Sequence, residues 1–381
     1  MKELTMDILH IGVDDHDLDL FEGQYEVPNG MAYNSYMILD EKNAVIDSVD
    51  QRVSSNWLKQ INKNVDYLII SHMEPDHSGS VKEFMERFPK TTIVASSKAF
   101  VMMKQFYGEE YEDRRIIVKE GDTLLLGKHT LRFIMAPMVH WPEVMVTYDE
   151  SAKVLFSADA FGKFGASDAK EEWACEARRY YVGIVGKFGM QVQNLLKKVG
   201  ALDIECICPL HGPVLKENLE HYINLYDIWS SYRYETEGVM IAYTSVYGNT
   251  KRAVEELKNN LVANGCPKVV LTDLARCDMA EAVEDAFRYG KLVLATTTYN
   301  NEIFPFMREF INNLVERNYQ DRTLAFIENG SWAPTAAKIM RNMFEKSKNI
   351  KYIGQDITIK SAITPDNLKE LQELASVLCK N

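Results

Sequence analysis

Closely spaced cysteine pairs of the kind that bind iron or zinc are missing from this 381-residue sequence. Its six cysteines include no C-x-x-C motif, which excludes a rubredoxin-like or zinc-ribbon site. Cys206 and Cys208 form a C-x-C pair in the apolar stretch "IECICPLHG". We interpret both as small core residues that stay reduced.

Long apolar runs are also missing. No stretch approaches the roughly 20 apolar residues that a membrane helix needs. The opening stretch "MKELTMDILHIGVDD" contains early acidic residues and lacks the apolar core of a signal peptide. We therefore expect a cytoplasmic protein without a membrane partner.

Positive charge is in short supply. The formal net charge of -12 argues against nucleic acid as a partner, because binding phosphates requires a basic face. Hydrophobic residues make up 46% of the chain, which is ample for packed cores and excludes general disorder. The length favours two domains over one.

The two parts of the sequence have different patterns. Up to about residue 235, short apolar strands such as "SYMILD", "TLRFIMAP" and "KVLFSAD" alternate with turns, and helices are expected near 53–62 and 79–88. After "YETEG", strands and helices alternate strictly from "VMIAYT" to a last helix near 366–379. The fold class is therefore α/β: layered sheets flanked by helices, then a doubly wound parallel sheet. We place the two domains at 1–237 and 238–381.

A dense set of potential metal ligands stands in "SHMEPDHSGS", residues 71–80, directly after an apolar strand. His72, Glu74 and Asp76 alternate with other residues there, and burying three such polar groups without a metal would be costly. Three further candidates, His140, Asp159 and His211, each follow a predicted strand, where a rigid sheet can position a ligand. The sequence therefore predicts a metal centre built from six residues.

The order of these ligands resembles a known family. The first half is similar to the metallo-β-lactamase fold, whose hydrolases carry H-x-H-x-D-H; here Glu74 replaces the second histidine. With His140, a gap of eighteen residues, Asp159 and then His211, the pattern resembles the flavodiiron proteins. An added carboxylate makes the site harder and more anionic, which favours iron over zinc.

The resemblance implies a role for each ligand. His72, Glu74 and His140 would hold one iron, Asp76 and His211 would hold the other, and Asp159 would bridge them. The neighbouring His77 matches a zinc ligand of the hydrolases but is usually not a ligand in flavodiiron proteins. We leave it outside the expected ligand set.

A second site is expected at "YTSVYGNT", residues 243–250, between the first strand and first helix of the second domain. Hydroxyls, close backbone approach and a helix N-terminus favour a phosphate there. The loops "TTTYNNEIFP" and "ENGSWAP" follow later strands, so Tyr299 and Trp332 are candidates to sandwich an isoalloxazine ring. No G-x-G-x-x-G is present, which disfavours NAD or FAD of the Rossmann kind. The expected contact residues are Ser245, Val246, Tyr247, Gly248, Asn249, Thr250, Thr297, Thr298, Tyr299, Asn300, Asn301, Asn329, Gly330, Ser331 and Trp332.

Across its whole length the chain resembles a flavodiiron protein of the simplest two-domain class. The resemblance implies a metallo-β-lactamase-like αββα sandwich with two non-haem irons, followed by a flavodoxin-like domain with FMN. It implies reduction of dioxygen to water, of nitric oxide to nitrous oxide, or of both. It further implies a separate electron donor, rubredoxin or a deazaflavin coenzyme, and a head-to-tail homodimer or a dimer of such dimers.

Two other classes remain open. A dinuclear zinc hydrolase with a fused flavodoxin domain would explain the first half but not Glu74. A plain electron-transfer flavoprotein would explain the second half but leaves the six ligand candidates without a role.

Overall fold

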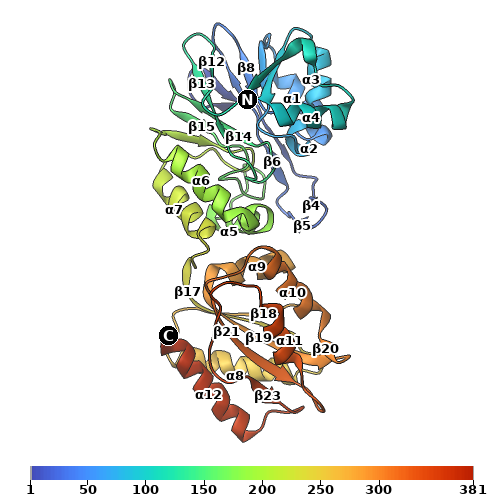
Figure 1. The fold of residues 1–381 in the computed structure, drawn as a ribbon, viewed down its shortest axis with the longest axis vertical. Helices are drawn as coiled ribbons and strands as arrows, with labels where there is room; N and C mark the ends of the chain where they lie inside the picture. The colour runs from blue at the N-terminus through green and yellow to red at the C-terminus, as the bar shows by residue number, and fades with distance from the viewer. Residues whose placement is uncertain (1, 381) are drawn as a thin grey trace. The chain divides into compact units, whose positions relative to one another are not determined.

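The computed structural model describes residues 2–380, and the chain divides into two units, residues 1–227 and 228–381 (Figure 1). The division falls earlier than the boundary expected from the sequence. That boundary, between 237 and 238, lies inside strand β17 (Thr236–Tyr243).

Two sheets form the framework of unit 1. The larger has seven strands in the order β1-β2-β7-β8-β9-β10-β11, and the smaller has five in the order β12-β13-β14-β15-β16. The strands of the larger sheet are β1 (Lys2–Glu3), β2 (Ile8–His10), β7 (Tyr36–Ile38), β8 (Ala44–Ile46), β9 (Tyr67–Ile69), β10 (Thr92–Ser96) and β11 (Arg115–Val118). Those of the smaller sheet are β12 (Thr123–Leu125), β13 (Thr130–Met135), β14 (Met145–Asp149), β15 (Val154–Phe156) and β16 (Cys206–Cys208). Two short pairs add β3 (Val13–Asp15) with β6 (Met31–Tyr33), and β4 (Leu20–Phe21) with β5 (Tyr25–Glu26).

The core of unit 1 lies between these two sheets. Alternate residues of a strand point to one face, so residues such as Ile38 and Ile69 of one sheet meet Phe133 and Phe156 of the other in a single buried cluster. The C-x-C pair of β16 belongs to the same cluster, as expected for small core residues. Both of its thiols are free, with their Sγ atoms 3.7 Å apart.

Helices flank the sandwich, as the sequence predicts (Figure 1). The expected helices near 53–62 and 79–88 correspond to α1 and α3, which pack together through the stacked rings of Trp57 and Phe84, 5.4 Å apart. The helices are α1 (Ser54–Gln60), α2 (Pro75–Ser78), α3 (Val81–Arg87), α4 (Ser97–Tyr107), α5 (Trp173–Tyr180), α6 (Gly189–Val199) and α7 (Leu219–Ser230). Short 3-10 or π segments are Gln51–Val53, Glu112–Arg114, Tyr181–Val185 and Gly186–Phe188.

Unit 2 is a doubly wound parallel sheet, as predicted. Its strands lie in the order β18-β17-β19-β21, with β22 and β23 both paired to β21, and every neighbour on this path is parallel. The remaining strands are β18 (Val269–Asp273), β19 (Tyr289–Tyr299), β20 (Glu302–Ile303), β21 (Thr323–Asn329), β22 (Lys351–Tyr352) and β23 (Ile357–Ile359). The helices are α8 (Asn249–Ala263), α9 (Met279–Arg288), α10 (Pro305–Glu316), α11 (Ala336–Met343) and α12 (Pro365–Lys380).

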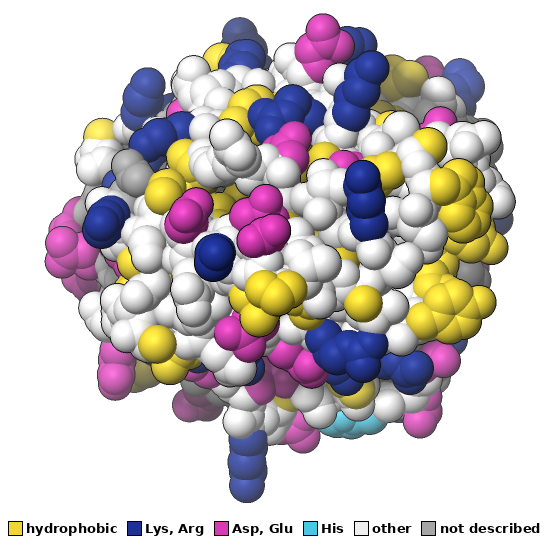
Figure 2. Space-filling model, turned by 90° about the horizontal axis from the view of Figure 1, so that it is seen from below, with side chains coloured by type: hydrophobic (Ala, Val, Ile, Leu, Met, Phe, Trp, Pro, Cys, Tyr) yellow, Lys and Arg dark blue, Asp and Glu magenta, His cyan; other side chains and the backbone are white. Residues whose placement is uncertain are grey.

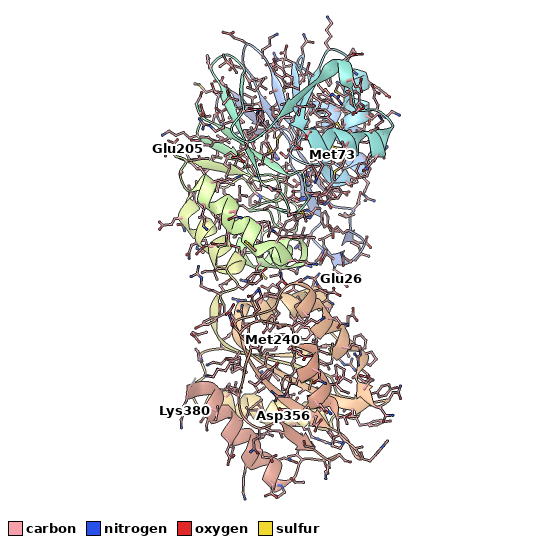
Figure 3. The ribbon with its side chains drawn as sticks, in the orientation of Figure 1. Glu26, Met73, Glu205, Met240, Asp356 and Lys380 are labelled. Carbon is pink, nitrogen blue, oxygen red and sulfur yellow. The ribbon has the colours of Figure 1, made fainter. Side chains whose placement is uncertain are left out.

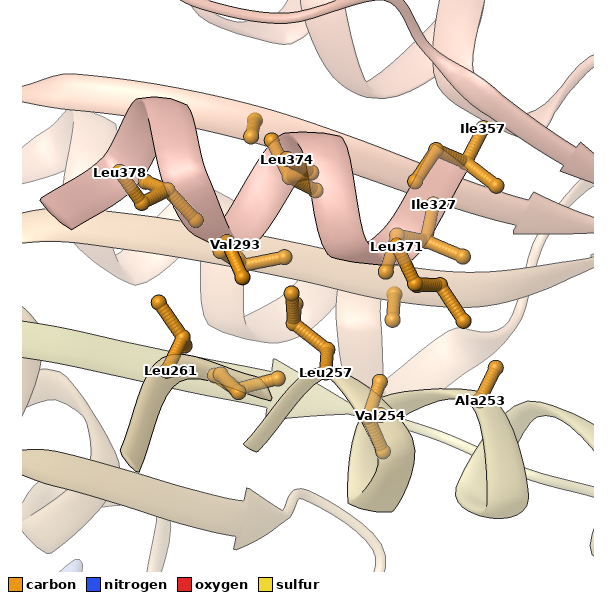
Figure 4. Close-up of a cluster of buried hydrophobic side chains, with 14 of the residues drawn as sticks. Ala253, Val254, Leu257, Leu261, Val293, Ile327, Ile357, Leu371, Leu374 and Leu378 are labelled. Carbon is orange, nitrogen blue, oxygen red and sulfur yellow. The ribbon is translucent and has the colours of Figure 1, made fainter. Parts of the chain in front are cut away.

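Helices α8 and α12 pack side by side over one face of this sheet (Figure 4). Leu257 and Leu261 of α8 meet Leu371, Leu374 and Leu378 of α12, all of them buried. The spacing of three to four residues along each helix places these side chains on one face. Each fully buried leucine contributes on the order of 2 kcal/mol, so this seam is a main source of the unit's stability.

A buried arginine explains why residues before β17 belong with unit 2. Arg322 donates to the backbone carbonyls of Tyr232 (2.6 Å), Arg233 (3.3 Å) and Tyr289 (3.0 Å). The backbone N–H of Glu235 also donates to the carbonyl of Arg288 at the end of α9 (2.9 Å). The segment that precedes β17 is thereby fixed to the second unit.

The surface agrees with the balance of charge in the sequence. On the face that Figure 2 shows, acidic and basic side chains of the described residues are interspersed among apolar ones. Among residues 2–380, no helix combines the length and the apolar content needed to cross a bilayer.

A buried ion pair in unit 1 makes a pH-dependent contribution that can be tested. His129 lies 2.5 Å from the carboxylate of Asp149, and this hydrogen bond raises the pKa of His129. A histidine whose pKa is raised by folding stabilises fully below its unfolded value, near 6.5, and the contribution is lost as pH rises through the folded value. We expect His129→Gln to cost about 1 kcal/mol at pH 6 and less at alkaline pH. Thermal unfolding of both proteins across that range would measure it, and a pH-independent difference would contradict this assignment.

Candidate metal centre and cofactor pocket

The loop that carries His72 and Glu74 is fixed at its start, and Asp76 follows it on α2. It leaves β9 at Ser71, whose backbone N–H and hydroxyl donate to the buried carboxylate of Asp47 at 2.7 and 2.6 Å. Burial raises the pKa of Asp47 to about 6, while the two bonds from Ser71 act in the opposite direction. Past the loop, α2 begins at Pro75, a residue type suited to the first helical position.

Four predicted ligands meet at one point. His72, Glu74, His140 and Asp159 each offer one nitrogen or oxygen atom, and these four atoms lie within 4.8 Å of one another. His140 Nε2 is 2.9 Å from Glu74 Oε2 and 3.0 Å from Asp159 Oδ2. His72 Nε2 is 3.3 Å from the same Asp159 oxygen.

A second set lies beside the first and includes His77, which is not among the six expected ligands. Asp76 Oδ2 is 3.2 Å from His211 Nε2, as expected, and also 3.1 Å from His77 Nε2. The two imidazole Nε2 atoms are 2.9 Å apart. His77 therefore shares the geometry of the predicted ligands, and its position directly after Asp76 in the motif was the available signal.

Asp159 stands between the two sets. Its Oδ2 faces His72 and His140, and its Oδ1 faces His77 at 3.3 Å and His211 at 4.0 Å. The two oxygens of one carboxylate thus address different groups of imidazoles, which is the geometry of a bridging ligand.

The nitrogen and oxygen atoms of this cluster are better suited to binding metal ions than to forming hydrogen bonds with one another. Both ring nitrogens of His72, both oxygens of Asp76 and Oδ1 of Asp159 are buried without a hydrogen-bond partner among the described residues. His211 Nδ1 donates to the carbonyl of Ala32 at 2.8 Å, which leaves the Nε2 lone pair directed at the cluster. Buried polar atoms left in this condition are costly unless a cation binds them. Three carboxylates and four imidazoles suit a pair of first-row transition ions.

Electrostatics inside the cluster keep its carboxylates ionised. Burial would raise the pKa of Asp159, but His72, His140 and His77 outweigh burial and hold it well below its usual range. Burial would likewise lower the pKa of His140, yet Asp159 and Glu74 raise it to about 9. The carboxylates are therefore available as anionic ligands at neutral pH.

Two further glutamates lie around the cluster. The buried carboxylate of Glu143 accepts the backbone N–H of Met73 (2.9 Å), the residue between His72 and Glu74 that Figure 3 labels. Glu143 thereby holds the backbone that presents both ligands. Glu22, on the turn between β4 and β5, lies beside Glu74; burial first, and then the Glu74 charge, raise the pKa of Glu22 to about 7. No sequence motif marks these two residues, since the fold alone brings them to the site.

The predicted cofactor loops also come together, at the carboxyl ends of the strands of unit 2. They line a pocket of about 380 Å³ next to the N-terminus of α8. Gly248 is the one predicted contact residue that does not line the pocket; with φ of 85° it shapes the turn, and its N–H donates to Ser245 Oγ (3.1 Å). Ala333 and Ser361 line it in addition to the predicted residues. The pocket residues are Ser245, Val246, Tyr247, Asn249, Thr250, Thr297, Thr298, Tyr299, Asn300, Asn301, Asn329, Gly330, Ser331, Trp332, Ala333 and Ser361.

Large aromatic side chains stand exposed around this pocket. Tyr247 is 91% exposed, Trp332 is 81% exposed and Tyr299 is 44% exposed. Exposing three such rings in one place is costly unless something flat and apolar covers them. The pocket combines a helix N-terminus for an anion with aromatic walls for a ring system.

Comparison with known proteins agrees with the division into two different domains. Residues 31–212 match a family model described as "ODP family beta lactamase", and residues 240–354 match a flavodoxin domain. A nitric oxide reductase of Moorella thermoacetica is 30% identical, over 91% of this chain and 90% of that protein. The flavodiiron protein from Giardia intestinalis superposes with a TM-score of 0.93 at 27% identity, over 100% of this chain and 96% of that one. Rubredoxin oxygen:oxidoreductase from Desulfovibrio gigas gives 0.91 at 24% identity, over 100% and 98%, and shows the fold alone.

The first half of the chain thus has a metallo-β-lactamase-like fold and the second half a flavodoxin fold, as predicted. The chain belongs to the flavodiiron protein family.

Proposed function

We propose that this protein reduces dioxygen to water, nitric oxide to nitrous oxide, or both, with electrons passing from an external donor through FMN to two irons. One observation carries the proposal: Asp159 presents its two oxygens to two separate groups of ligands. A chain that pairs such a dinuclear centre with a flavin-type pocket is suited to redox chemistry on a small molecule.

The ligand set of the proposed centre has seven members. His72, Glu74 and His140 would hold one iron, and Asp76, His77 and His211 the other, with Asp159 between them. When bound, the two irons would supply open positions for a diatomic molecule and electrons for its reduction. Glu74 adds negative charge to the first set, which favours iron in its oxidised state.

Aromatic side chains of this chain pack around the histidines of the proposed centre. Tyr33 sets its ring edge-on to His77 and His211, with ring centroids 6.4 and 6.0 Å apart. Tyr180 packs at 5.4 Å from His211, and Trp141 at 6.3 Å from His72. An apolar wall of this kind limits the entry of bulk water while a small uncharged gas can pass.

In the flavin pocket, the N-terminus of α8 and the turn at Ser245 would hold the FMN phosphate. Tyr299 and Trp332 would flank the isoalloxazine ring, and the backbone of Asn300 and Asn301 would face its polar edge. Both asparagines have positive φ, 52° and 60°, which turns the backbone sharply at the pocket wall.

We expect Trp332→Ala and Tyr299→Ala each to weaken FMN retention about tenfold or more, because each removes a ring that stacks on the flavin. Flavin content after dialysis and the flavin reduction potentials would measure this. Tyr352→Ala is the matched control, since Tyr352 is 37% exposed in the same unit but outside the pocket. Native retention and potentials in both test variants would place the ring elsewhere.

The proposed partners follow from the two sites. A small external protein such as rubredoxin, or a soluble deazaflavin, would deliver electrons to the exposed edge of the flavin. We propose a head-to-tail homodimer, alone or within a dimer of dimers, in which the FMN of one chain serves the metal centre of the other. A self-complementary pairing of this kind supplies two such contacts at once.

Metal and flavin analysis, followed by anaerobic turnover with each gas, tests the function. Two irons and one FMN per chain, with donor oxidation that depends on added dioxygen or nitric oxide, are expected. Two zincs and hydrolase activity would instead favour the hydrolase alternative. Flavin without metal, and no gas-dependent oxidation, would favour the electron-transfer alternative.

A further inference from the structure

Two cysteines lie together at one end of the seam between α8 and α12, and the pocket of unit 2 lies at the other end of α8. Cys266 follows α8 after Ala263, and Cys379 lies in the last turn of α12, beside Lys380, which Figure 3 labels. Leu261 and Leu378, neighbours of these cysteines, lie at the same end of the two helices in Figure 4. Residues 113 apart in the sequence are thus brought to one place.

The contacts of the two cysteines converge on a single atom. The carbonyl oxygen of Leu261 accepts the backbone N–H of Cys266 at 3.0 Å and the thiol of Cys379 at 3.9 Å. The Cys266 thiol donates to the carbonyl of Lys268 at 3.3 Å. Both cysteines are partly buried and pack against the same hydrophobic cluster.

The Cys266 thiol also acts on the thiol of Cys379. Burial, and after it the Cys266 thiol, raise the pKa of Cys379. Both thiols are free, and each retains some exposure to solvent. A small oxidant can therefore reach the pair, whereas Cys208 is fully buried in the core of unit 1.

We propose that Cys266 and Cys379 form a redox-responsive pair that a hydroperoxide oxidises to a disulfide. The Cys266 thiolate attacks the O–O bond of hydrogen peroxide, which breaks, and the first water leaves after one proton is taken up. The sulfenic acid on Cys266 is then attacked by the thiolate of Cys379; the S–S bond forms and the second water leaves. In total, two thiols lose two electrons and two protons, and one peroxide becomes two waters.

The disulfide would close a loop that runs from Cys266 to Cys379 and contains β18 to β23 and most of α12. Closing a loop of this length restricts the unfolded chain and so stabilises the folded unit. Because α8 carries the turn of the flavin pocket at its other end, the oxidised form would hold the pocket more firmly. The folded unit would thus become more stable under oxidising conditions.

The test uses the full-length, flavin-loaded protein, handled anaerobically and then titrated with hydrogen peroxide. Alkylation of the remaining thiols, digestion and mass spectrometry identify the linked peptides. We expect a Cys266–Cys379 peptide, reversed by dithiothreitol, in the wild type and in the Cys277→Ser control. Cys277 is also partly buried in unit 2, but burial raises its pKa to about 11. Oxidation of Cys266 to sulfinic acid without a linked peptide, or a linkage to another cysteine, would overturn the proposal.

A second variant tests the proposal without relying on detection of the linked peptide. In Cys379→Ser the sulfenic acid on Cys266 has no partner thiol, so a dimedone adduct should accumulate there after peroxide treatment. Peroxide should raise the thermal midpoint of unit 2 by at least about 5 °C in the wild type and in Cys277→Ser. An equal rise in Cys379→Ser, or no rise in the wild type, would contradict a stabilising cross-link between these two residues.

Discussion

Replacing Glu74 by histidine is expected to abolish gas reduction while FMN stays bound. The variant removes one of three carboxylates from the cluster and converts the first set toward the all-histidine pattern of zinc hydrolases. Turnover with either gas should fall by at least about 100-fold, since changes in outer partners of metal ligands already cost about 10- to 100-fold. Metal content should shift from iron toward zinc when both are supplied during expression.

A matched control is Glu205→His, which makes the same change of residue type on an exposed position of unit 1 (Figure 3). That variant should keep iron, flavin and turnover. Normal iron content together with normal turnover in Glu74→His would show that this carboxylate does not determine the metal. Metal analysis and anaerobic kinetics on the same preparations separate the two outcomes.

Mixing two inactive variants is expected to restore activity if electrons cross between chains. His140→Ala would lack a complete metal centre but keep FMN, and a replacement of residues 245–250 would lack FMN but keep the metal centre. Each parent should be nearly inactive. After subunit exchange, one side of the mixed dimer would pair the intact flavin of one chain with the intact metal centre of the other. Activity should then approach half that of the wild type per mixed dimer, because one of two contacts is complete.

The control for this experiment mixes two metal-defective variants, His140→Ala and Asp159→Ala. That pair has no intact metal centre in any combination and should stay inactive. If verified mixed dimers of the first pair also stay inactive, electron transfer takes place within one chain and the head-to-tail arrangement is wrong for this protein. Size measurements and tagged subunits verify that exchange has occurred.

The sequence predicted that these six residues would come together because each lies in a segment that follows a strand, either β9 of the larger sheet or β13, β15 or β16 of the smaller one. His77 was different. Its position in the motif could be recognised from the sequence. Its orientation could not, because the four-residue helix α2 is what turns the His77 ring toward His211. The resemblance to the family argued against His77, whereas the cluster itself includes it.

The pocket of unit 2 shows the same limit. Its loops were predictable from their places after β17, β19 and β21, but Ser361 was not. It reaches the pocket because β23 pairs with β21, and its N–H donates to the Asn329 side chain at 3.1 Å. Contacts of this kind depend on pairing between distant segments, which local sequence patterns do not encode.

The backbone carbonyls that accept hydrogen bonds from Arg322 restrict where the chain can be cut to produce a fragment of unit 2. A flavodoxin fragment that begins at Gly238 would omit Tyr232 and Arg233, whose carbonyl oxygens accept from that guanidinium. It would also remove the first two residues of β17. A buried cation that loses its acceptors is a severe penalty for a small domain. A fragment of unit 2 therefore needs residues 228–237 as well, ten residues more than the strand pattern alone suggests.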